Sequence, residues 1–149
     1  MRKNTGAIFT RRRLRRCSTI FTEEPAKKYL NNPNLAHGPV AAEMITKDFG
    51  VDDKEIIDAV RYHTTGRPCM TMLDKIIYIA DATEPGRSYP GVEELRREAE
   101  SDIDKACLDS LKKTIDFVAS EGNFLDRLTV EAEKYLEEKI NKKEKSDDK

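Results

Sequence analysis

Two histidines and one aspartate carry the clearest chemical potential in this chain of 149 residues: His37, His63 and Asp81. His63 follows Ile56 by seven residues, so it shares the apolar face of a predicted helix. Asp81 follows Ile77 by four residues on the apolar stripe of the next predicted helix, and a buried carboxylate is costly unless it is paired or bound to a metal. Imidazole nitrogen with carboxylate oxygen suits Fe, Zn, Mn or Ni better than Ca or Mg. The three residues, one from each of three successive helices, therefore predict a shared metal site.

Each of these residues also has an ordinary structural explanation. A histidine in a core usually hydrogen-bonds a carbonyl group, and a core aspartate usually pairs with arginine or caps a helix. The spacing alone leaves both the metal site and these structural roles open.

Two loops that contain glycine and arginine follow the candidate ligands. The sequence TTGR at 64–67 comes directly after His63, and EPGR at 84–87 comes shortly after Asp81. Glycine lets the backbone approach a bound group, and arginine offers a planar fork of donors suited to phosphate. We therefore expect both arginines to be exposed and to bind a phosphate-containing ligand, whereas the structural alternatives are an ordinary helix C-cap for TTGR and an ordinary turn for EPGR.

The hydrophobic pattern is helical from about residue 38 onward, and no segment reads as a convincing strand. Gly50 can end the first helix, and Asp52 or Asp53 can cap the second. Helices are expected near 38–49, 51–63, 70–82, 92–99, 101–121 and 129–140. We therefore predict an all-α domain over residues 22–140, after an irregular basic segment at 1–21 and before a disordered charged tail at 141–149.

The composition excludes several classes of protein. Hydrophobic residues make up 38% of the chain and charged residues 37%, with a net charge of −1, so no overall field attracts nucleic acid or membrane. No apolar run is long enough for a transmembrane helix or a signal peptide. The three cysteines lack the spacing of a metal pair or a disulfide framework, which predicts reduced thiols and a cytoplasmic protein.

Four motifs together resemble one known family. They are HGPVAA at 37–42, AVRYHTTGR at 59–67, MLDKIIYIADATEPGR at 72–87 and YPGVEELR at 89–96. Over about residues 22–140 the chain is similar to the YqeK-type HD-domain phosphohydrolases, which are bacterial symmetrical diadenosine tetraphosphate hydrolases.

The resemblance implies an HD-type helical domain with a two-metal centre, in which iron is the expected metal. It implies that this centre hydrolyses diadenosine tetraphosphate to two ADP. It implies that a dinucleoside polyphosphate or nucleoside diphosphate binds, and that the metal ligands are His37, His63 and Asp81. By motif position, the residues that contact nucleotide or phosphate would be Thr64, Thr65, Gly66, Arg67 and Arg87. Lys75 also falls in a matching segment, where only a solvated helix face explains it.

The chain departs from the family pattern near its start. The family carries an adjacent His-Asp pair after an apolar segment like GAIF, but here GAIF at 6–9 is followed by TRRRLRRCST, and the sequence contains no His-Asp dipeptide. We hypothesise that residues 10–21 are a frameshift product and that the N-terminal helices of the domain are missing. The alternatives for the arginine run are a basic arm for nucleic acid and a transit peptide.

This departure gives the hydrolase function an alternative. Without the His-Asp pair the chain can be a catalytically inactive nucleotide-binding or interaction module of the same fold. Missing N-terminal helices would also expose the faces of the helices at 38–49 and 51–63, from which we expect marginal stability or formation of a homodimer. No membrane or nucleic-acid partner is expected.

Overall fold

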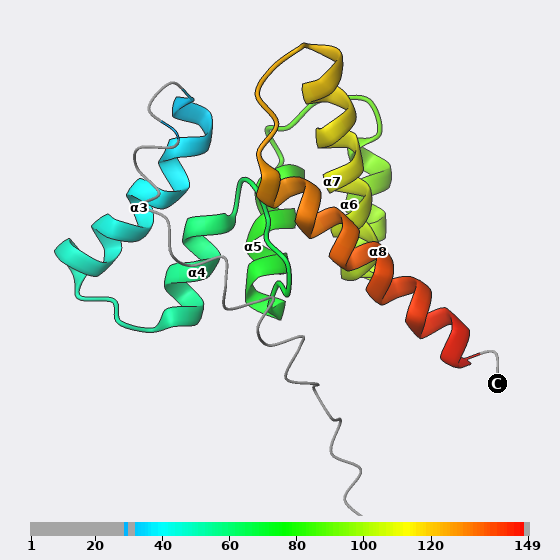
Figure 1. Cartoon of the computed structure of the whole chain (residues 1–149), viewed down its shortest axis with the longest axis horizontal. Coiled ribbons are helices and arrows are strands. Elements are labelled where there is room, and N and C mark those ends of the chain that lie inside the picture. Colours follow the sequence, from blue (N-terminus) through cyan, green and yellow to red (C-terminus); the bar gives the residue numbers. More distant parts are fainter. Residues whose placement is uncertain (1–28, 30–31, 148–149) are drawn as a thin grey trace, which may run out of the picture.

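The computed structural model describes residue 29 and residues 32–147, and every regular element in this part of the chain is an α-helix. The helices are α3 (Pro33–Phe49), α4 (Lys54–Tyr62), α5 (Met72–Thr83), α6 (Val92–Ser101), α7 (Ile103–Ser120) and α8 (Arg127–Asp147). In Figure 1, α3 and α4 lie on one side of α5, and α6, α7 and α8 lie on its other side. The predicted all-α fold is confirmed.

Gly38 allows α3 to pack closely on the end of α4. A Cβ atom at Gly38 would lie 2.7 Å from the carbonyl oxygen of Arg61 and 3.3 Å from that of Val60, so any other side chain would push the helices apart. The helix begins with Pro33 in its first turn and ends at Gly50, whose φ of 66° is left-handed. This close approach places the start of α3 beside the end of α4, where the two histidines lie.

Side-chain caps fix the starts of α4 and α5. The carboxylate of Asp53 accepts hydrogen bonds from the backbone N–H groups of Glu55 and Ile56, at 2.8 and 3.3 Å. Thr71 and Asp74 form a reciprocal capping box at the start of α5. The predicted boundary between the first two helices is therefore confirmed.

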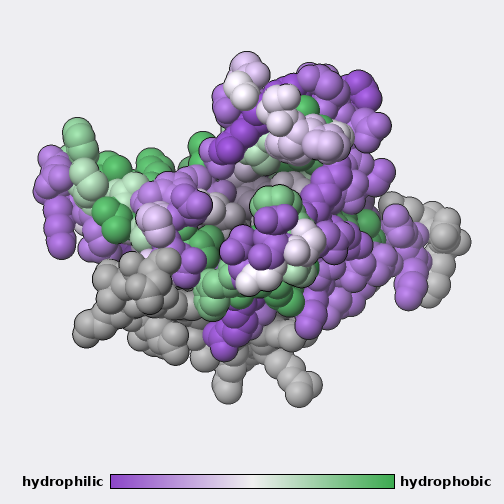
Figure 2. Space-filling model, turned by 90° about the horizontal axis from the view of Figure 1, so that it is seen from above, coloured by the Kyte–Doolittle hydropathy of each residue, from purple (hydrophilic) through white to green (hydrophobic). Residues whose placement is uncertain are grey.

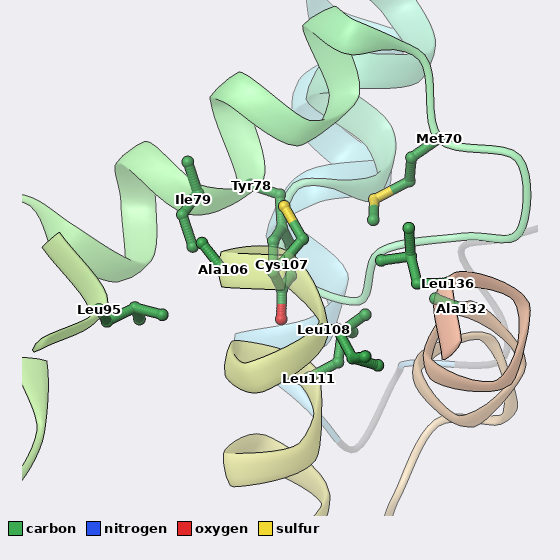
Figure 3. Close-up of a cluster of buried hydrophobic side chains, with 10 residues drawn as sticks. All are labelled: Met70, Tyr78, Ile79, Leu95, Ala106, Cys107, Leu108, Leu111, Ala132 and Leu136. Atoms are coloured by element: carbon green, nitrogen blue, oxygen red, sulfur yellow. The ribbon is translucent and has the colours of Figure 1, made fainter. Parts of the chain in front are cut away.

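The hydrophobic core lies between α5, α6, α7 and α8 (Figure 3). Its members share near-complete burial and come from these helices and the loop before α5: Met70, Tyr78, Ile79, Leu95, Ala106, Cys107, Leu108, Leu111, Ala132 and Leu136. By contrast, α3 contributes few buried residues, and hydrophobic side chains reach the surface in the part of the molecule that holds it (Figure 2). The C-terminal four helices thus carry most of the core.

The buried face of α5 differs from the predicted stripe. Ile77 and Asp81 were expected to face the core, but Ile77 is 38% exposed and the Asp81 side chain is 46% exposed. The helix instead buries Tyr78 and Ile79, together with a lysine and an aspartate nearer its start. Ion pairs compensate for the burial of these charged residues, so the stripe of apolar residues alone pointed to the wrong face.

The C-terminal tail is helical further than expected. The sequence predicts disorder over 141–149, but α8 continues to Asp147, so the prediction is wrong for residues 141–147. The extension contains three lysines and one glutamate, which are good helix formers, and Nζ of Lys142 lies 3.8 Å from Oε2 of Glu138 one turn earlier. The basic segment at 1–21 and the hypothesis of a frameshift over 10–21 lie outside the described residues.

The cysteines do not all match the expectation of reduced thiols. Cys107 is a free and buried thiol, and its burial raises its pKa to about 12, so it is an inert core residue. Cys69 is disulfide-bonded, so the expectation is wrong for this residue, and Cys17 lies outside the described residues. No helix in the described part of the chain is both long and apolar enough to cross a membrane.

Candidate functional site

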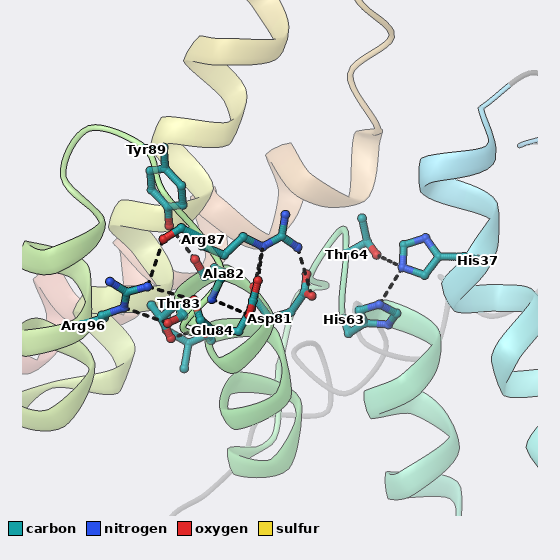
Figure 4. A network of polar contacts seen from close by, with 12 residues as sticks. His37, His63, Thr64, Asp81, Ala82, Thr83, Glu84, Arg87, Tyr89 and Arg96 are labelled. Carbon is teal, nitrogen blue, oxygen red and sulfur yellow. Dashed lines mark hydrogen bonds and ion pairs between the residues drawn. The ribbon is translucent and has the colours of Figure 1, made fainter.

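The two histidines meet between α3 and α4 (Figure 4). His37 lies in the first half of α3, and His63 is the C-cap residue of α4. Their Nε2 atoms are 2.8 Å apart, with the ring centroids 4.7 Å apart and the ring planes at 67°. Two imidazoles from different helices therefore aim the same nitrogen at one point.

Hydrogen bonding indicates which ring nitrogen of neutral His63 carries the hydrogen. Its Nδ1 lies 2.6 Å from the carbonyl oxygen of Val60, and because a carbonyl only accepts, Nδ1 carries the hydrogen. In neutral His63 the Nε2 lone pair then points at His37 Nε2, which also lies 3.2 Å from the Thr64 hydroxyl. This contact needs either a hydrogen on His37 Nε2 or a cation shared by both nitrogens.

Asp81 does not join the histidine pair. Its carboxylate Oδ1 instead lies 3.2 Å from Nη2 of Arg87. Among the described residues, no group of three or more His, Cys, Asp and Glu side chains lies close enough to hold a metal ion. The structure thus brings together two of the three predicted ligands, while the third, Asp81, pairs with Arg87 near the exposed end of α5.

The TTGR loop turns mostly inward. Thr65 and Gly66 are buried, and the Thr65 hydroxyl donates to the carbonyl of Gly66 at 2.9 Å. Gly66 has a φ of 67°, and a Cβ atom there would lie 3.3 Å from Cδ2 of Leu111 on α7. Thr64 alone of the four loop residues contacts the histidine pair, so the helix C-cap explains most of this loop.

Arg67 is a buried structural residue, contrary to the expectation of exposure. Its side chain is 10% exposed, and its Nε and Nη2 lie 2.9 and 2.7 Å from Oδ2 of Asp74 on α5. Nη2 also lies 3.7 Å from Oδ2 of Asp58 on α4. The guanidinium therefore joins two helices through two buried carboxylates and is not presented to a ligand.

Arg87 has the accessibility that Arg67 lacks. Its side chain is 48% exposed, and it donates from Nε to the carbonyl oxygen of Asp81 at 3.1 Å. Glu84 adds a longer contact, with Oε1 at 3.7 Å from Nε. About half of the Arg87 side chain thus remains open to solvent, where a phosphate group can approach it.

Comparison with known proteins identifies the family. The model of the HD domain family matches residues 17–86. A solved structure from Clostridium acetobutylicum, described as a "predicted HD superfamily hydrolase involved in NAD metabolism", is 41% identical with a TM-score of 0.73, and the match covers 86% of this chain and 67% of that one. The chain belongs to the HD domain family.

Three curated relatives share one name. The protein of Bacillus subtilis named "Bis(5'-nucleosyl)-tetraphosphatase, symmetrical" is 49% identical over 94 residues, which are 63% of this chain and 50% of the relative. The protein of the same name from Halalkalibacterium halodurans is 39% identical over 107 residues, which are 70% of this chain and 57% of the relative. The chain therefore spans about half the length of the curated relatives that it matches.

The donor chemistry of the HD site fits a metal in part. Hydrolases of the HD family generally depend on a divalent metal. The facing Nε2 atoms of His37 and His63 suit a first-row transition metal, and the bond from Nδ1 of His63 to a carbonyl is the usual way in which a ligand histidine is oriented. Catalytic zinc sites commonly use three protein ligands, so the two histidines supply fewer donors than a complete centre needs.

Lys75 has a role that the sequence did not indicate. It is buried, not on a solvated helix face, and its Nζ lies 2.5 Å from Oδ1 of Asp104 on α7. Lys139 on α8 approaches the other oxygen of Asp104 at 2.7 Å. Only the packing of three helices reveals this triad, because a lysine on a helix usually indicates a solvated face.

Replacement of Asp104 tests this triad through its pH dependence. Partial burial raises the pKa of Asp104, but hydrogen bonds from Lys139 and Lys75 outweigh it and hold the pKa below the ordinary value of 3.8. We expect Asp104→Asn to lower the free energy of unfolding by about 2 kcal/mol at neutral pH. Because the pKa of Asp104 is lowered in the folded state, the stabilisation by its carboxylate is complete above pH 3.8. It disappears as pH falls through the pKa of the folded protein. Urea denaturation of both proteins at several pH values measures this, and a deficit that is independent of pH in that range would contradict it.

Proposed function

We propose that this HD domain is a metal-dependent phosphohydrolase that cleaves diadenosine tetraphosphate symmetrically into two ADP. The convergence of His37 Nε2 and His63 Nε2 at 2.8 Å carries the proposal, since it gives the domain a place for a metal. The names of the relatives from Bacillus subtilis and Halalkalibacterium halodurans support the substrate and the symmetry of cleavage.

The reaction assigns distinct tasks to the residues of the site. Water attacks one of the two inner phosphorus atoms, the bond from that phosphorus to the central bridging oxygen breaks, a proton leaves the water, and two ADP separate. A bound divalent metal activates water and stabilises charge on phosphoryl oxygens. His37 and His63 would hold it through Nε2, and the exposed guanidinium of Arg87 would orient a phosphate group through its planar donors.

We expect hydrolysis by this chain to be much slower than hydrolysis by a longer relative. The two histidines are the only ones in the sequence, and Asp81 is held by Arg87. A metal held by few protein donors binds weakly, so little of the protein would carry it at ordinary metal concentrations. If metal binding is too weak for turnover, the same geometry leaves a nucleotide-binding module without activity, which is the alternative function.

Product analysis with diadenosine tetraphosphate tests the proposal. The purified chain is incubated with added iron, manganese or cobalt, beside the Bacillus subtilis relative and the variant His63→Ala. We expect slow formation of ADP that requires metal and is lost in His63→Ala. Formation of AMP and ATP would overturn symmetrical cleavage. ADP binding without hydrolysis would establish the inactive module, and ADP formation at the rate of the relative would refute the expected slow turnover.

Three finer features belong to the same proposal. Iron is the proposed metal, and metal analysis of protein purified without added metal identifies it. A homodimer is proposed because Val40 and Met44 on α3 and Ile56 on α4 are each about half exposed, and light scattering after size-exclusion chromatography measures its mass. A cytoplasmic location follows from the proposed nucleotide substrate.

A further inference from the structure

Side chains from outside the helix satisfy the carbonyl groups at the C-terminal end of α5. The last four carbonyls of a helix lack partners within it, and a left-handed glycine often provides some of the missing hydrogen bonds. Here the C-cap residue is Glu84, which has a φ of −54° and a ψ of 151° and is not left-handed. Arg87 donates to the carbonyl of Asp81 at 3.1 Å, and the Tyr89 hydroxyl donates to that of Ala82 at 2.7 Å. The end of α5 is therefore closed by the loop that follows it and by one further residue.

That further residue is Arg96 on α6, which joins the two ends of the EPGR loop (Figure 4). Its Nε donates to the carbonyl of Thr83 at 2.9 Å, and its Nη2 donates to the carbonyls of Glu84 at 2.8 Å and Arg87 at 3.1 Å. Its Nη1 pairs with Glu93 one turn earlier on α6. One planar cation thus spans the last residue of α5 and the first and last residues of the loop.

The hydrogen bond from Arg96 to the carbonyl of Arg87 influences the direction of the Arg87 side chain. Because the backbone of Arg87 is held through its carbonyl, its side chain can fold back over α5 and reach both the carbonyl and the carboxylate of Asp81. A guanidinium that is already oriented loses less conformational freedom when a ligand binds. Arg96 itself is engaged on Nε, Nη1 and Nη2, so it supports Arg87 and does not compete with it for a ligand.

We propose that Arg96 is the positioning residue of the nucleotide site, acting through Arg87, which it holds in the direction that receives a phosphate group. The inference rests on the proposed function for the ligand, while the effect on the loop itself stands apart from any ligand. Lysine cannot replace Arg96, because a single ammonium group lacks the fork that reaches three carbonyls at once.

Affinity for ADP, measured by calorimetry in a double-mutant cycle, tests how Arg96 acts. We expect Arg96→Gln and Arg96→Lys each to weaken ADP binding about tenfold, at the low end of the loss seen when the partner that orients a binding residue is removed. In the Arg87→Ala background, Arg96→Gln should have no further effect, because its action passes through Arg87. Glu93→Gln is the matched control, since it removes the ion pair on Nη1 but leaves the three carbonyl bonds, and it should bind ADP as the unchanged protein does.

Amide hydrogen exchange tests the loop without any ligand. The backbone N–H of Arg87 donates to the carbonyl of Glu84 at 2.9 Å, so its exchange reports whether the loop is held. Arg96→Gln should accelerate this exchange about tenfold or more, while amides in the core of α7 stay unchanged. Unchanged exchange at Arg87 would overturn the positioning role, and so would additive losses of ADP affinity in the cycle. If the unchanged protein binds no ADP, the proposed nucleotide function fails, and the exchange measurement still decides whether Arg96 holds the loop.

Discussion

Replacing Arg67 by alanine is expected to lower the free energy of unfolding by about 3–5 kcal/mol, the usual cost of removing one partner of a buried ion pair. The guanidinium lies between Asp74, at 2.7 Å from Nη2, and Asp58, at 3.7 Å. Both carboxylates are almost fully buried, so the variant would leave Asp74 without its cation, while Asp58 would keep only its ion pair with the exposed Lys54 at 2.5 Å. Chemical denaturation followed by circular dichroism measures the loss.

Arg87→Ala is the matched control for this prediction. It removes the same charge from the second glycine-arginine loop, but the Arg87 side chain is half exposed and its partner Asp81 is equally exposed. We expect a cost below about 1 kcal/mol, as for other exposed ion pairs. If Arg67→Ala costs no more than Arg87→Ala, the contacts of Arg67 with the buried carboxylates contribute little to folding, and the interpretation of Arg67 as a structural residue is wrong.

The two arginine loops show where sequence reasoning reaches its limit. Both loops place arginine after glycine, and both arginines suit phosphate by residue type. The TTGR loop leads to the capping box of α5, and Asp74 of that box binds the Arg67 side chain in the interior. The EPGR loop, in contrast, crosses an exposed helix end. Residue type and loop position cannot separate these cases, because the burial of a charged side chain depends on partners that come from other helices.

Local chemistry, in contrast, was sufficient for helix boundaries. Gly50 ends α3 in the left-handed conformation, and the carboxylate of Asp53 caps α4, both as predicted, because such signals act within a few residues. The structure also brings His37 and His63 together, as expected from their places on successive helices. The buried face of α5 did not follow the predicted stripe, since it is shifted by one residue and leaves Asp81 exposed beside Arg87.

Metal binding is expected to depend on the two histidines and not on Asp81. Calorimetric titration of the chain with cobalt should show one site. Its affinity for cobalt should fall at least about 100-fold in His63→Ala and in His37→Ala. Loss of an outer partner of a metal ligand costs about 10–100-fold, and loss of the ligand itself costs at least as much. The Nε2 atoms of His37 and His63 face each other at 2.8 Å, so a metal bound there would need both, and neither can replace the other.

Asp81→Ala separates the observed arrangement from the predicted ligand set of three residues. Its carboxylate lies beside Arg87, at 3.2 Å from Nη2, so its removal should change cobalt affinity by less than about threefold, within the ordinary variation for a residue outside the site. A loss as large as that in His63→Ala would mean that Asp81 leaves Arg87 and turns to the histidines when metal binds. That result would restore the full ligand set of His37, His63 and Asp81, and it would free Arg87 for a phosphate group in the same step. A small loss would instead leave two histidines as the protein donors, which is the physical basis for the slow hydrolysis expected of this chain.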